Sequence, residues 1–436
     1  MSHLLLRGGR LMDPSTGRDE TADLLVRDGV VAEGSAQPGD EGVIIDASGL
    51  VVAPGFIDVH VHLREPGGED AETILTGSRA AAKGGFTTVV AMPNTRPPLD
   101  TPDRVVWVIR KAQEAGLTRV FPAGCITKDR QGLLVADLEA MEAAGAAVFT
   151  DDGSTVMSDD VMEQAMIRSA RLNRVIMDHA QDHQAEKAGV MHEGHFSRKF
   201  NLPGIPAEAE ARIVERDIRL AEKTGCRLHI QHVSAAESVD LIASARERGL
   251  PVTGEVTPHH LTLTDADIDP ANADFKMNPP LRSERDRQRL IEGLCEGTLT
   301  VLATDHAPHS AAQKAEGFLA APFGIIGLET AIGITLDQLV DPGRMDLMSW
   351  IKLWTTGPAP IVNRLPPSLR PGSAADIVLM DLHTAWTIQK EDFLSLSRNS
   401  PFLGRRVHGK ALFTLLNGRM VWSHPEGAGR LGKTSR

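Results

Sequence analysis

The chain contains no tyrosine and only three cysteines, Cys125, Cys226 and Cys295, among its 436 residues. Without tyrosine, acid–base chemistry must come from histidine, aspartate, glutamate, lysine or cysteine. The cysteines are odd in number, widely spaced and never form a CxxC pair, which argues against a disulfide framework and a thiolate zinc site. We therefore expect a reducing, cytoplasmic setting.

Long apolar runs and an excess of basic residues are missing as well. No apolar stretch reaches the roughly 18 residues that a membrane-spanning helix needs, and the apolar run near the start is too short for a secretory signal. The net charge of −12 and the isoelectric point near 5.7 argue against nucleic acid or an anionic membrane as partner. We expect a soluble, intracellular protein.

Both ends of the chain are rich in short strand-like runs separated by turns that contain glycine, whereas the middle is not. These runs cover residues 4–9, 22–29, 43–46, 375–380 and 411–419. The pattern is typical of a small antiparallel sheet. We expect a small β-sandwich domain formed jointly by residues 1–54 and 366–436, with a larger domain of residues 55–365 inserted between them.

The middle of the chain alternates strand-like and helix-like segments. Alternation of this kind implies βα units and a parallel sheet, and eight such units favour a closed (β/α)8 TIM-like barrel. A doubly wound open sheet is the alternative, but no GxGxxG loop follows any strand. Helices are expected at 76–83, 102–115 and 208–223, among others. The strand-like runs lie near 57–62, 87–92, 119–123, 146–150, 174–178, 226–232, 251–256 and 299–304.

The first of these runs contains the pair His60 and His62 within Phe-Ile-Asp-Val-His-Val-His-Leu-Arg. Because successive side chains on a strand point to opposite faces, the two histidines are expected to share one face. Adjacent imidazoles on a buried strand repel each other when protonated and need polar partners when neutral. A divalent metal satisfies both conditions, and the alternative is a pair of core histidines bonded to backbone carbonyls.

Further polar residues that can bind metal recur where other strands of the expected barrel end. The active site of such a barrel lies at the carboxyl ends of its strands. Each residue alone has a structural alternative, because a strand-end aspartate often caps a helix. Together they predict the nitrogen and oxygen ligand set that zinc prefers in catalytic sites. These groups are His60 and His62, Asp151 and Asp152, Asp178 and His179, His229 to His232, and Asp305 to His309.

On the sixth strand, alternation puts His232 on the face of Ile230 and puts His229 on the opposite face. Only one of the two can face the barrel axis, and His232, nearer the strand end, is the better ligand. We expect His229 to point outward beneath a helix. His259 and His260 follow the seventh strand, and we interpret them as loop structure or as outer partners of the ligands.

Several segments together resemble the class I dihydroorotases of the cyclic-amidohydrolase superfamily. The run from Pro54 to Gly67 looks like the metal signature of that superfamily, and three later segments are similar to those of the class I branch. The resemblance covers nearly the whole chain, with the motifs in the same order and spacing. The later segments are Ala91-Met92-Pro93-Asn94-Thr95, Met277-Asn278-Pro279-Pro280-Leu281-Arg282 and Ala303-Thr304-Asp305-His306-Ala307-Pro308-His309.

The resemblance implies a site for one or two zinc ions. Many relatives bridge two metals with a carbamylated lysine on strand four, but this chain has Asp151 and Asp152 after that strand and no lysine in it. The class I pattern favours Asp152 as the bridging group, and Asp151 is expected to bond to backbone or to cap a helix. The implied ligands are His60, His62, Asp152, His179, His232 and Asp305.

The resemblance also implies the reversible cyclisation of N-carbamoyl-L-aspartate to L-dihydroorotate in pyrimidine biosynthesis. Asp305 is expected to move the proton between the attacking water and the ring nitrogen. Arg64 has the fork geometry that suits a substrate carboxylate. From their position after Asp305, residues 310–322 are expected to form an active-site lid, with an ordinary surface loop as the alternative. The implied substrate-binding residues are Arg64, Asn94, Asn278, His309, Phe323 and Gly324.

Two alternatives stay open at this point. Another cyclic-amide hydrolase, a dihydropyrimidinase or an allantoinase, would act on substrates without the ring carboxylate. A non-catalytic subunit that scaffolds aspartate carbamoyltransferase would need no metal ligands, whereas every expected ligand position here is filled. A complex with that transferase and a homo-oligomer are both compatible with an active enzyme.

Overall fold

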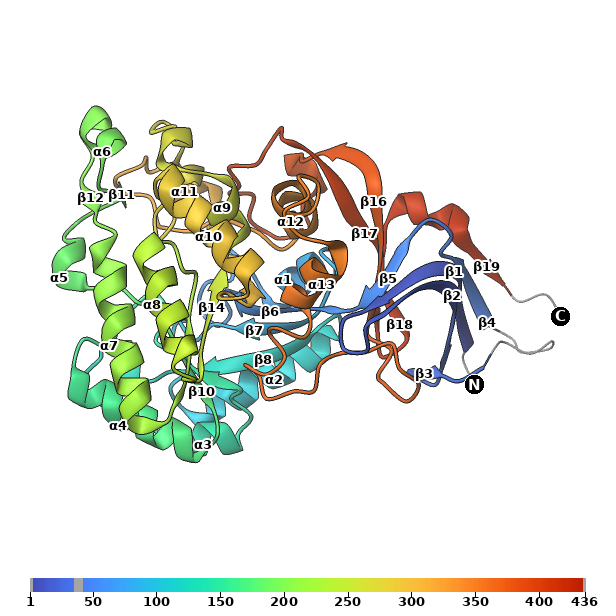
Figure 1. Ribbon diagram of the computed structural model, residues 1–436, viewed down its shortest axis with the longest axis horizontal. Coiled ribbons are helices and arrows are strands. Elements are labelled where there is room, and N and C mark those ends of the chain that lie inside the picture. The colour runs from blue at the N-terminus through green and yellow to red at the C-terminus, as the bar shows by residue number, and fades with distance from the viewer. Residues whose placement is uncertain (1–2, 35–41, 434–436) are drawn as a thin grey trace.

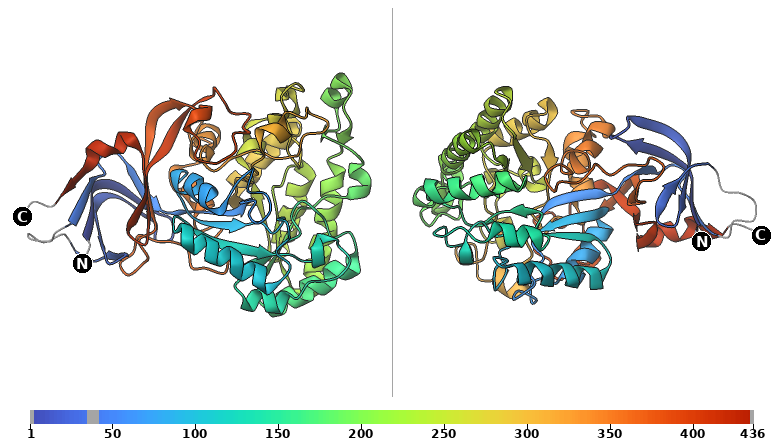
Figure 2. Two further views of the ribbon diagram at one scale, coloured as in Figure 1. Left: turned by 180° about the vertical axis from the view of Figure 1, so that it is seen from behind. Right: turned by 90° about the horizontal axis from the view of Figure 1, so that it is seen from below.

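The computed structural model describes residues 3–34 and 42–433; residues 1–2, 35–41 and 434–436 of the expected terminal segments lie outside the described residues. The chain forms an α/β barrel and, beside it along the long axis, a β sheet built from both ends of the chain (Figure 1). The same two parts are seen from behind and from below in Figure 2. This arrangement confirms the expected fold class.

Eight parallel strands in one continuous order form the barrel. Its two edge strands approach each other at their carboxyl ends, where the backbone N–H of His62 donates to the carbonyl of His306 over 2.8 Å. The sheet is thereby nearly closed, which distinguishes it from a doubly wound open sheet. The strands are β6 (Phe56–Val61), β7 (Phe86–Ala91), β8 (Arg119–Gly124), β9 (Val148–Phe149), β10 (Val175–Asp178), β13 (Arg227–Ile230), β14 (Val252–Val256) and β15 (Val301–Leu302).

Helices cover the outside of the barrel. Helix α1 begins at Ile74, two residues earlier than expected, because the Thr73 hydroxyl accepts from the backbone N–H of Thr76 and caps it. Aromatic rings fasten α13 to the first strands, since Trp354 lies edge-on to Phe86 with centroids 5.2 Å apart. The helices are α1 (Ile74–Lys83), α2 (Pro102–Ala115), α3 (Leu138–Ala143), α4 (Asp159–Arg171), α7 (Glu208–Thr224), α8 (Ala236–Glu247), α10 (Glu284–Glu296), α12 (Ala331–Leu339) and α13 (Leu347–Trp354).

Apolar side chains fill the inside of the barrel below the strand ends. They come from six of the eight strands, all but β13 and β14, and contact one another, so they form a packed core rather than a channel. The polar strand-end residues therefore lie on a closed apolar floor. This inner cluster includes Ile57, Val59, Val90, Met92, Ala123, Val148, Val175, Met177, Val301 and Ala303.

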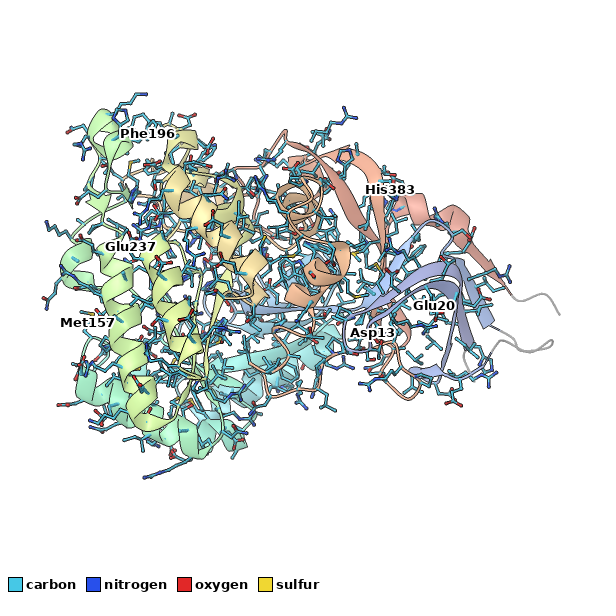
Figure 3. The ribbon with its side chains drawn as sticks, in the orientation of Figure 1. Asp13, Glu20, Met157, Phe196, Glu237 and His383 are labelled. Atoms are coloured by element: carbon cyan, nitrogen blue, oxygen red, sulfur yellow. The ribbon has the colours of Figure 1, made fainter. Side chains whose placement is uncertain are left out.

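Short helices, strands and turns lie in the loops, most of them at the carboxyl ends of the barrel strands. A two-stranded sheet and two short helices follow β10, and Phe196 marks their outer tip in Figure 3. Among the described residues no helix is long and apolar enough to cross a membrane. The short elements are α5 (His183–Glu186), β11 (Met191–His192), α6 (His195–Phe200), β12 (Gly204–Ile205), α9 (Pro258–Thr262) and α11 (Ala311–Lys314), with 3₁₀ turns at Lys128–Arg130, Asp265–Asp267, Ala273–Phe275, Lys390–Asp392 and Pro425–Arg430.

The terminal sheet combines strands from both ends of the chain. Its sequence pattern suggested an antiparallel sheet, but the sheet is mixed, because β1 pairs in parallel with β4 through its first half and with β5 through its second. One apolar cluster contains side chains from the strands of both chain ends. The strands are β1 (His3–Asp13), β2 (Arg18–Arg27), β3 (Val30–Ala32), β4 (Gly42–Asp46), β5 (Val51–Pro54), β16 (Ile377–Thr387), β17 (Arg406–Leu416), β18 (Arg419–Ser423) and β19 (Leu431–Lys433).

Buried hydrogen bonds tie the two ends of the chain together. The carboxylate of Asp13, at the end of β1, accepts from the Ser368 hydroxyl and the backbone N–H of Leu369 at 2.7 and 2.8 Å. Figure 3 labels Asp13 beside the junction with the barrel, and Glu20 and His383 on the terminal sheet. The antiparallel pairing of β5 with β16 completes this connection.

Candidate active site

A bulge in β6 brings His60 and His62 to the carboxyl end of the barrel. Asp58 pairs with Val89 and Val61 with Ala91, so β6 has one residue more than β7 over this stretch. Val59 packs inside the barrel, and the rings of His60 and His62 lie above it with centroids 5.4 Å apart. Strict alternation therefore fails between Val59 and His60, although the two histidines remain neighbours.

Two carboxylates lie beside this histidine pair. Nε2 of His60 is 3.2 Å from Oδ1 of Asp152 and 3.4 Å from Oδ1 of Asp305. Nε2 of His62 is 3.0 Å from Oδ1 of Asp305 and 3.4 Å from Oδ2 of Asp152. The same nitrogen of each ring thus faces both carboxylates.

His179 and His232 approach the same aspartate from the other side. Nδ1 of His179 and Nε2 of His232 are 2.8 Å apart and lie 3.9 and 3.8 Å from Oδ1 of Asp152. Asp152 is therefore shared between two pairs of histidines. This is the position that a group bridging two metal ions would occupy.

The donor set fits a divalent cation. Ligand atoms of three overlapping groups lie within 4.8 Å of one another: His60 with His232 and Asp305, His60 with His62 and Asp152, and Asp152 with His179 and His232. All six side chains are buried. Histidine nitrogens with carboxylate oxygens are the usual ligands of catalytic zinc. A tetrahedral or five-coordinate ion needs no ligand beyond this set and a water molecule.

The electrostatics of the cluster also favour a cation. Burial lowers the pKa values of His179 and His232, so both rings are neutral and offer lone pairs. Burial lowers the pKa of His60 too, but the carboxylates of Glu255, Asp152 and Asp305 more than offset this and hold it well above its ordinary value. These carboxylates stabilise positive charge at the centre of the cluster, which a metal ion would supply.

Two side chains outside the cluster orient its histidines. Nδ1 of His60 donates to Oε1 of Glu255 over 2.6 Å, and Nδ1 of His62 lies 2.9 Å from Oδ1 of Asn94. Each contact is satisfied by a proton on Nδ1, so Nε2, which faces Asp152 and Asp305, is the atom that a metal ion would bind. Partners of this kind set the tautomer and the ring orientation of metal-binding histidines.

The prediction for His229 was wrong. Its ring is fully buried inside the barrel, with Nε2 3.0 Å from the Glu255 carboxylate and Nδ1 2.8 Å from the Thr253 hydroxyl. Strand β13 ends at Ile230, and His232 lies beyond it with φ of 31°, outside the alternation of the strand. Both histidines can therefore face inward, His229 as a partner of Glu255 and His232 within the cluster.

The neighbouring aspartates Asp151 and Asp58 fix the backbone around the site. Asp151 accepts from the backbone N–H groups of Ile126 and Thr127 and from the Thr127 hydroxyl, so it bonds to a loop and not to the cluster. Asp58 accepts from the backbone N–H and the hydroxyl of Thr304, at 3.1 and 2.6 Å, and from the backbone N–H of His60. The end of β6 is thereby joined to the segment that carries Asp305.

Three of the eleven described non-glycine residues with positive φ lie at this site. Arg64, His232 and Asp305 have φ values of 57°, 31° and 46°, in the left-handed region that residues with a β-carbon adopt rarely. Such conformations cost of the order of 1–3 kcal/mol each and persist where surrounding contacts enforce them. Their gathering at one strand-end cluster is typical of a functional site.

Arg64 lies against Pro308 and His309 and has available N–H groups. Its Nε donates to the carbonyl of Pro308 over 3.0 Å, and one terminal nitrogen lies 3.1 Å from Nε2 of His309. Burial and the nearby Arg64 lower the pKa of His309 to about 3, so that ring is neutral. Its Nε2 lies 2.7 Å from the carbonyl of Phe323 and must donate there. It cannot then accept from Arg64, whose terminal N–H groups can bind an anion.

Gly324 and Asn399 shape the wall beside His309. Gly324 has φ of 133°, and a β-carbon there would lie 2.7 Å from Cβ of Ala307 and 3.1 Å from Nε2 of His309. The Asn399 amide donates to the carbonyls of Ala307 and Gly324, and its oxygen accepts from the backbone N–H of His309. The segment that follows the terminal-sheet strand β16 thus contributes to the wall of the site.

The remaining predicted residues lie around the cluster. The Asn278 amide nitrogen is 3.2 Å from Nε2 of His179, and its buried oxygen has no partner among the described residues. His260 bonds to the Thr257 hydroxyl and the Pro279 carbonyl, and His259 adjoins it in α9. In segment 310–322 the Lys314 ammonium donates to the carbonyl of Pro322, and the lid function of this segment stays a prediction.

The sequence interpretation missed Glu255 and Asn399. Glu255 had a usable signal, because a glutamate in a buried apolar strand needs a positive or donating partner inside the barrel. Asn399 had none, since it lies in an irregular segment more than 70 residues beyond Gly324 in the chain.

Comparison with known proteins gives a consistent result. A family model described as "Dihydro-orotase-like" matches residues 49–238. A dihydroorotase from Solibacter usitatus (strain Ellin6076) is 44% identical over 423 residues, which cover 96% of this chain and 98% of that protein. A dihydroorotase from Geobacillus thermodenitrificans (strain NG80-2) is 47% identical over 379 residues, 87% of this chain and 89% of that protein.

Solved structures with the same fold include two hydrolases of other cyclic amides. The L-hydantoinase (dihydropyrimidinase) from Arthrobacter aurescens matches with a TM-score of 0.84 and 28% identity, covering 96% of each chain. A dihydropyrimidinase from Brevibacillus agri NCHU1002 matches with a TM-score of 0.81 and 25% identity, covering 97% of this chain and 95% of that one.

Proposed function

This chain belongs to the dihydroorotase family of cyclic amide hydrolases, and we propose that its reaction is the reversible ring closure of N-carbamoyl-L-aspartate to L-dihydroorotate in pyrimidine biosynthesis. One observation carries the proposal. A buried cluster of four histidines and two aspartates lies next to Arg64, an arginine with N–H groups free to bind a carboxylate.

We propose zinc as the metal, held by His60, His62, Asp152, His179, His232 and Asp305. When bound there, zinc would polarise the ring carbonyl and lower the pKa of the attacking water. The shared position of Asp152 between two histidine pairs supports two ions, with Asp152 in the bridging role that a carbamylated lysine has in other members of the superfamily.

Asp305 is the proposed catalytic acid and base. Burial raises the pKa of its carboxyl group, but the neighbouring His60 and His62 more than offset this and keep it ionised. The carboxylate can accept the proton of the attacking water and deliver it to the ring nitrogen as the amide bond breaks. The same steps in reverse serve ring closure.

The substrate carboxylate is proposed to bind Arg64. A guanidinium presents two parallel N–H groups to a carboxylate, which a single ammonium cannot do. Asn94 and Asn278 would add amide contacts, His309 a ring nitrogen, and Phe323 and Gly324 their backbone groups. Because the ligand carries a negative charge into a buried site, these donors are needed to replace its water.

Similarity to solved hydantoinases makes dihydropyrimidinase activity the second candidate function. Dihydrouracil and hydantoin carry no ring carboxylate, so the half-buried Arg64 beside the cluster would be left without an anionic partner. This favours dihydroorotate. A scaffold without catalysis is disfavoured because it would need no converging metal ligands.

The proposal is tested with protein stripped of metal and then reloaded with zinc. Reloaded protein should hydrolyse dihydroorotate and close carbamoyl-aspartate, and stripped protein should do neither. Asp305→Asn should lower turnover by about two orders of magnitude or more. Hydrolysis that is absent in zinc-loaded protein, alone or with its transferase partner, would refute the assignment.

Cytoplasmic location, a homo-oligomer and a complex with aspartate carbamoyltransferase belong to the same proposal. All three cysteines are free thiols, which is compatible with a reducing compartment. Sedimentation of the protein alone and with purified transferase would test both assemblies.

A further inference from the structure

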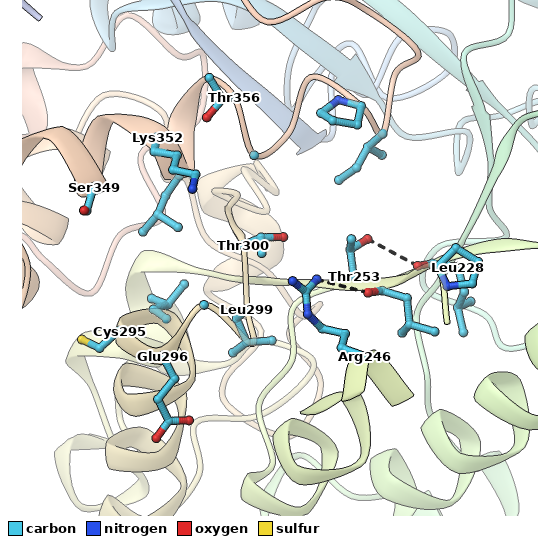
Figure 4. Close-up of a pocket in the computed structure, with 18 of the residues that line it drawn as sticks. Leu228, Arg246, Thr253, Cys295, Glu296, Leu299, Thr300, Ser349, Lys352 and Thr356 are labelled. Carbon is cyan, nitrogen blue, oxygen red and sulfur yellow. Dashed lines mark hydrogen bonds between the residues drawn. The ribbon is translucent and has the colours of Figure 1, made fainter. Parts of the chain in front are cut away.

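A cavity of about 840 Å³ lies at the opposite end of the barrel from the metal-binding side chains (Figure 4). Its wall includes Arg227 and Val252, the first residues of β13 and β14, and Thr300, which precedes β15. Since the strands are parallel, their amino ends are separated from His232 and Asp305 by the length of the barrel. This cavity is therefore not part of the site described above.

Four basic residues line the cavity without an ion pair. They are Arg227, Arg246, Arg344 and Lys352, and no carboxylate among the described residues lies within salt-bridge distance of any of them. The two acidic residues of the wall have other partners. Glu296 pairs with Arg289 at 3.1 Å, and Asp346 caps α13 by accepting from Ser349.

This concentration of positive charge runs against the balance of the whole chain, which carries a net charge of −12. Cations gathered in a concave wall repel one another unless an anion joins them. A basic residue in the last turn of a helix can also serve to complement the helix dipole, and Arg246 and Lys352 are both in such turns. Complementing the helix dipole does not, however, occupy the side-chain N–H groups of Arg246 and Lys352.

The donors of Arg246 and Lys352 are nearly all available. Arg246 makes one long hydrogen bond, 3.4 Å to the carbonyl of Val252, and Lys352 makes none to any described residue. Figure 4 shows both side chains directed into the cavity, with Thr300 on the wall between the segments that carry them. An arginine fork and an ammonium on facing walls match the several oxygens of a phosphate group.

We propose that this cavity binds a small organic anion that carries a phosphate group. The volume is within the range of about 300–1,000 Å³ that is usual for small-molecule sites. Arg246 and Lys352 would hold the phosphate. Arg227 and Arg344 would add positive charge, although both already donate to protein oxygens. The apolar part of the wall would contact the organic portion. That part of the wall comprises Leu228, Leu250, Pro251, Leu353 and Ile361. The proposal does not depend on the reaction proposed for the other end of the barrel.

The test is calorimetric titration of the zinc-loaded full chain with inorganic phosphate and with the four ribonucleoside 5′-monophosphates. At least one nucleotide should bind, and inorganic phosphate should bind about tenfold more weakly because it makes no apolar contact. The double variant Arg246→Gln with Lys352→Gln should bind that nucleotide at least about tenfold more weakly. Its dihydroorotate turnover and unfolding temperature should match those of the unaltered protein.

Arg248→Gln is the matched control, because Arg248 lies two residues from Arg246, outside the cavity, next to Glu222. Its nucleotide affinity should not change. Binding that the double variant retains would place the nucleotide elsewhere, for instance at the zinc, and would overturn the proposal. So would the absence of binding at millimolar concentrations. Equal affinity for phosphate and nucleotides would refute the proposal that the cavity also binds the organic portion of the ligand.

Discussion

The Nδ1 atom of His60 lies 2.6 Å from Oε1 of Glu255, and both side chains are fully buried. The same carboxylate contacts His229 and accepts from the backbone N–H of His232. One side chain of β14 thus orients residues from β6 and β13. This network explains how two histidines that are 172 residues apart in the chain hold one geometry.

Replacing Glu255 by glutamine should weaken metal binding. The amide keeps the size of the side chain but cannot hold the charge that favours a cation on His60, and loss of such a partner typically costs about 10–100-fold in metal affinity. Zinc retained during competition with a chelator measures the effect. Glu296→Gln, at an exposed position, is the control. If Glu255→Gln retains zinc as well as the control does, the positioning role of Glu255 is wrong.

Replacing Arg64 by lysine should raise the KM for dihydroorotate by about tenfold or more. The charge is retained, but the two parallel N–H groups are lost. Dihydrouracil, which has no carboxylate, is the control substrate. Any turnover of dihydrouracil should be no lower in the variant than in the unaltered protein. A parallel fall for both substrates would show that Arg64 supports the fold of the site and not the carboxylate.

Gly324→Ala should impair substrate binding far more than Gly317→Ala. Both glycines have positive φ, 133° and 84°, so both substitutions strain the backbone. Only the β-carbon at 324 meets neighbours, Ala307 and the His309 ring, whereas nothing lies within 4 Å at 317. The expected result is a raised KM for Gly324→Ala alone. Equal KM values for the two variants would contradict the proposed contact of this wall with substrate.

The barrel, its eight strands and the strand-end polar groups could be predicted because they follow from local pattern, and the choice of the six cluster residues among those groups came from the resemblance to class I dihydroorotases. Apolar strands, strand-end polar groups and motif spacing are all visible in one sequence. The face of His229 could not be predicted, because it depends on where β13 ends and on the left-handed φ of His232. The bulge beside His60 is set by pairing with β7. Asn399 joins the site only through tertiary contact.

Acidification should destabilise the protein through buried neutral histidines such as His192. Burial and the nearby Arg282 lower the pKa of His192 from 6.5 to about 4. Between these values the unfolded chain binds a proton that the folded chain does not, so stability present above pH 6.5 is lost as the pH falls toward 4. The contribution is up to roughly 3 kcal/mol.

His192→Gln should therefore flatten the dependence of the unfolding free energy on pH over that range. Denaturant unfolding at several pH values between 4 and 7 measures it. His383→Gln, at an exposed position on the terminal sheet, is the control and should leave the slope unchanged. An unaltered slope in His192→Gln would contradict the lowered pKa.

The most direct test of the central claim is the relative kcat/KM of the zinc-loaded protein for dihydroorotate, dihydrouracil, hydantoin and allantoin, measured with the zinc content of the same sample. A site built around the half-buried cation of Arg64 discriminates strongly against substrates that lack a carboxylate to pair with it. We predict at least a ~100-fold preference for dihydroorotate over each of the others. Faster turnover of dihydrouracil, hydantoin or allantoin would contradict the account.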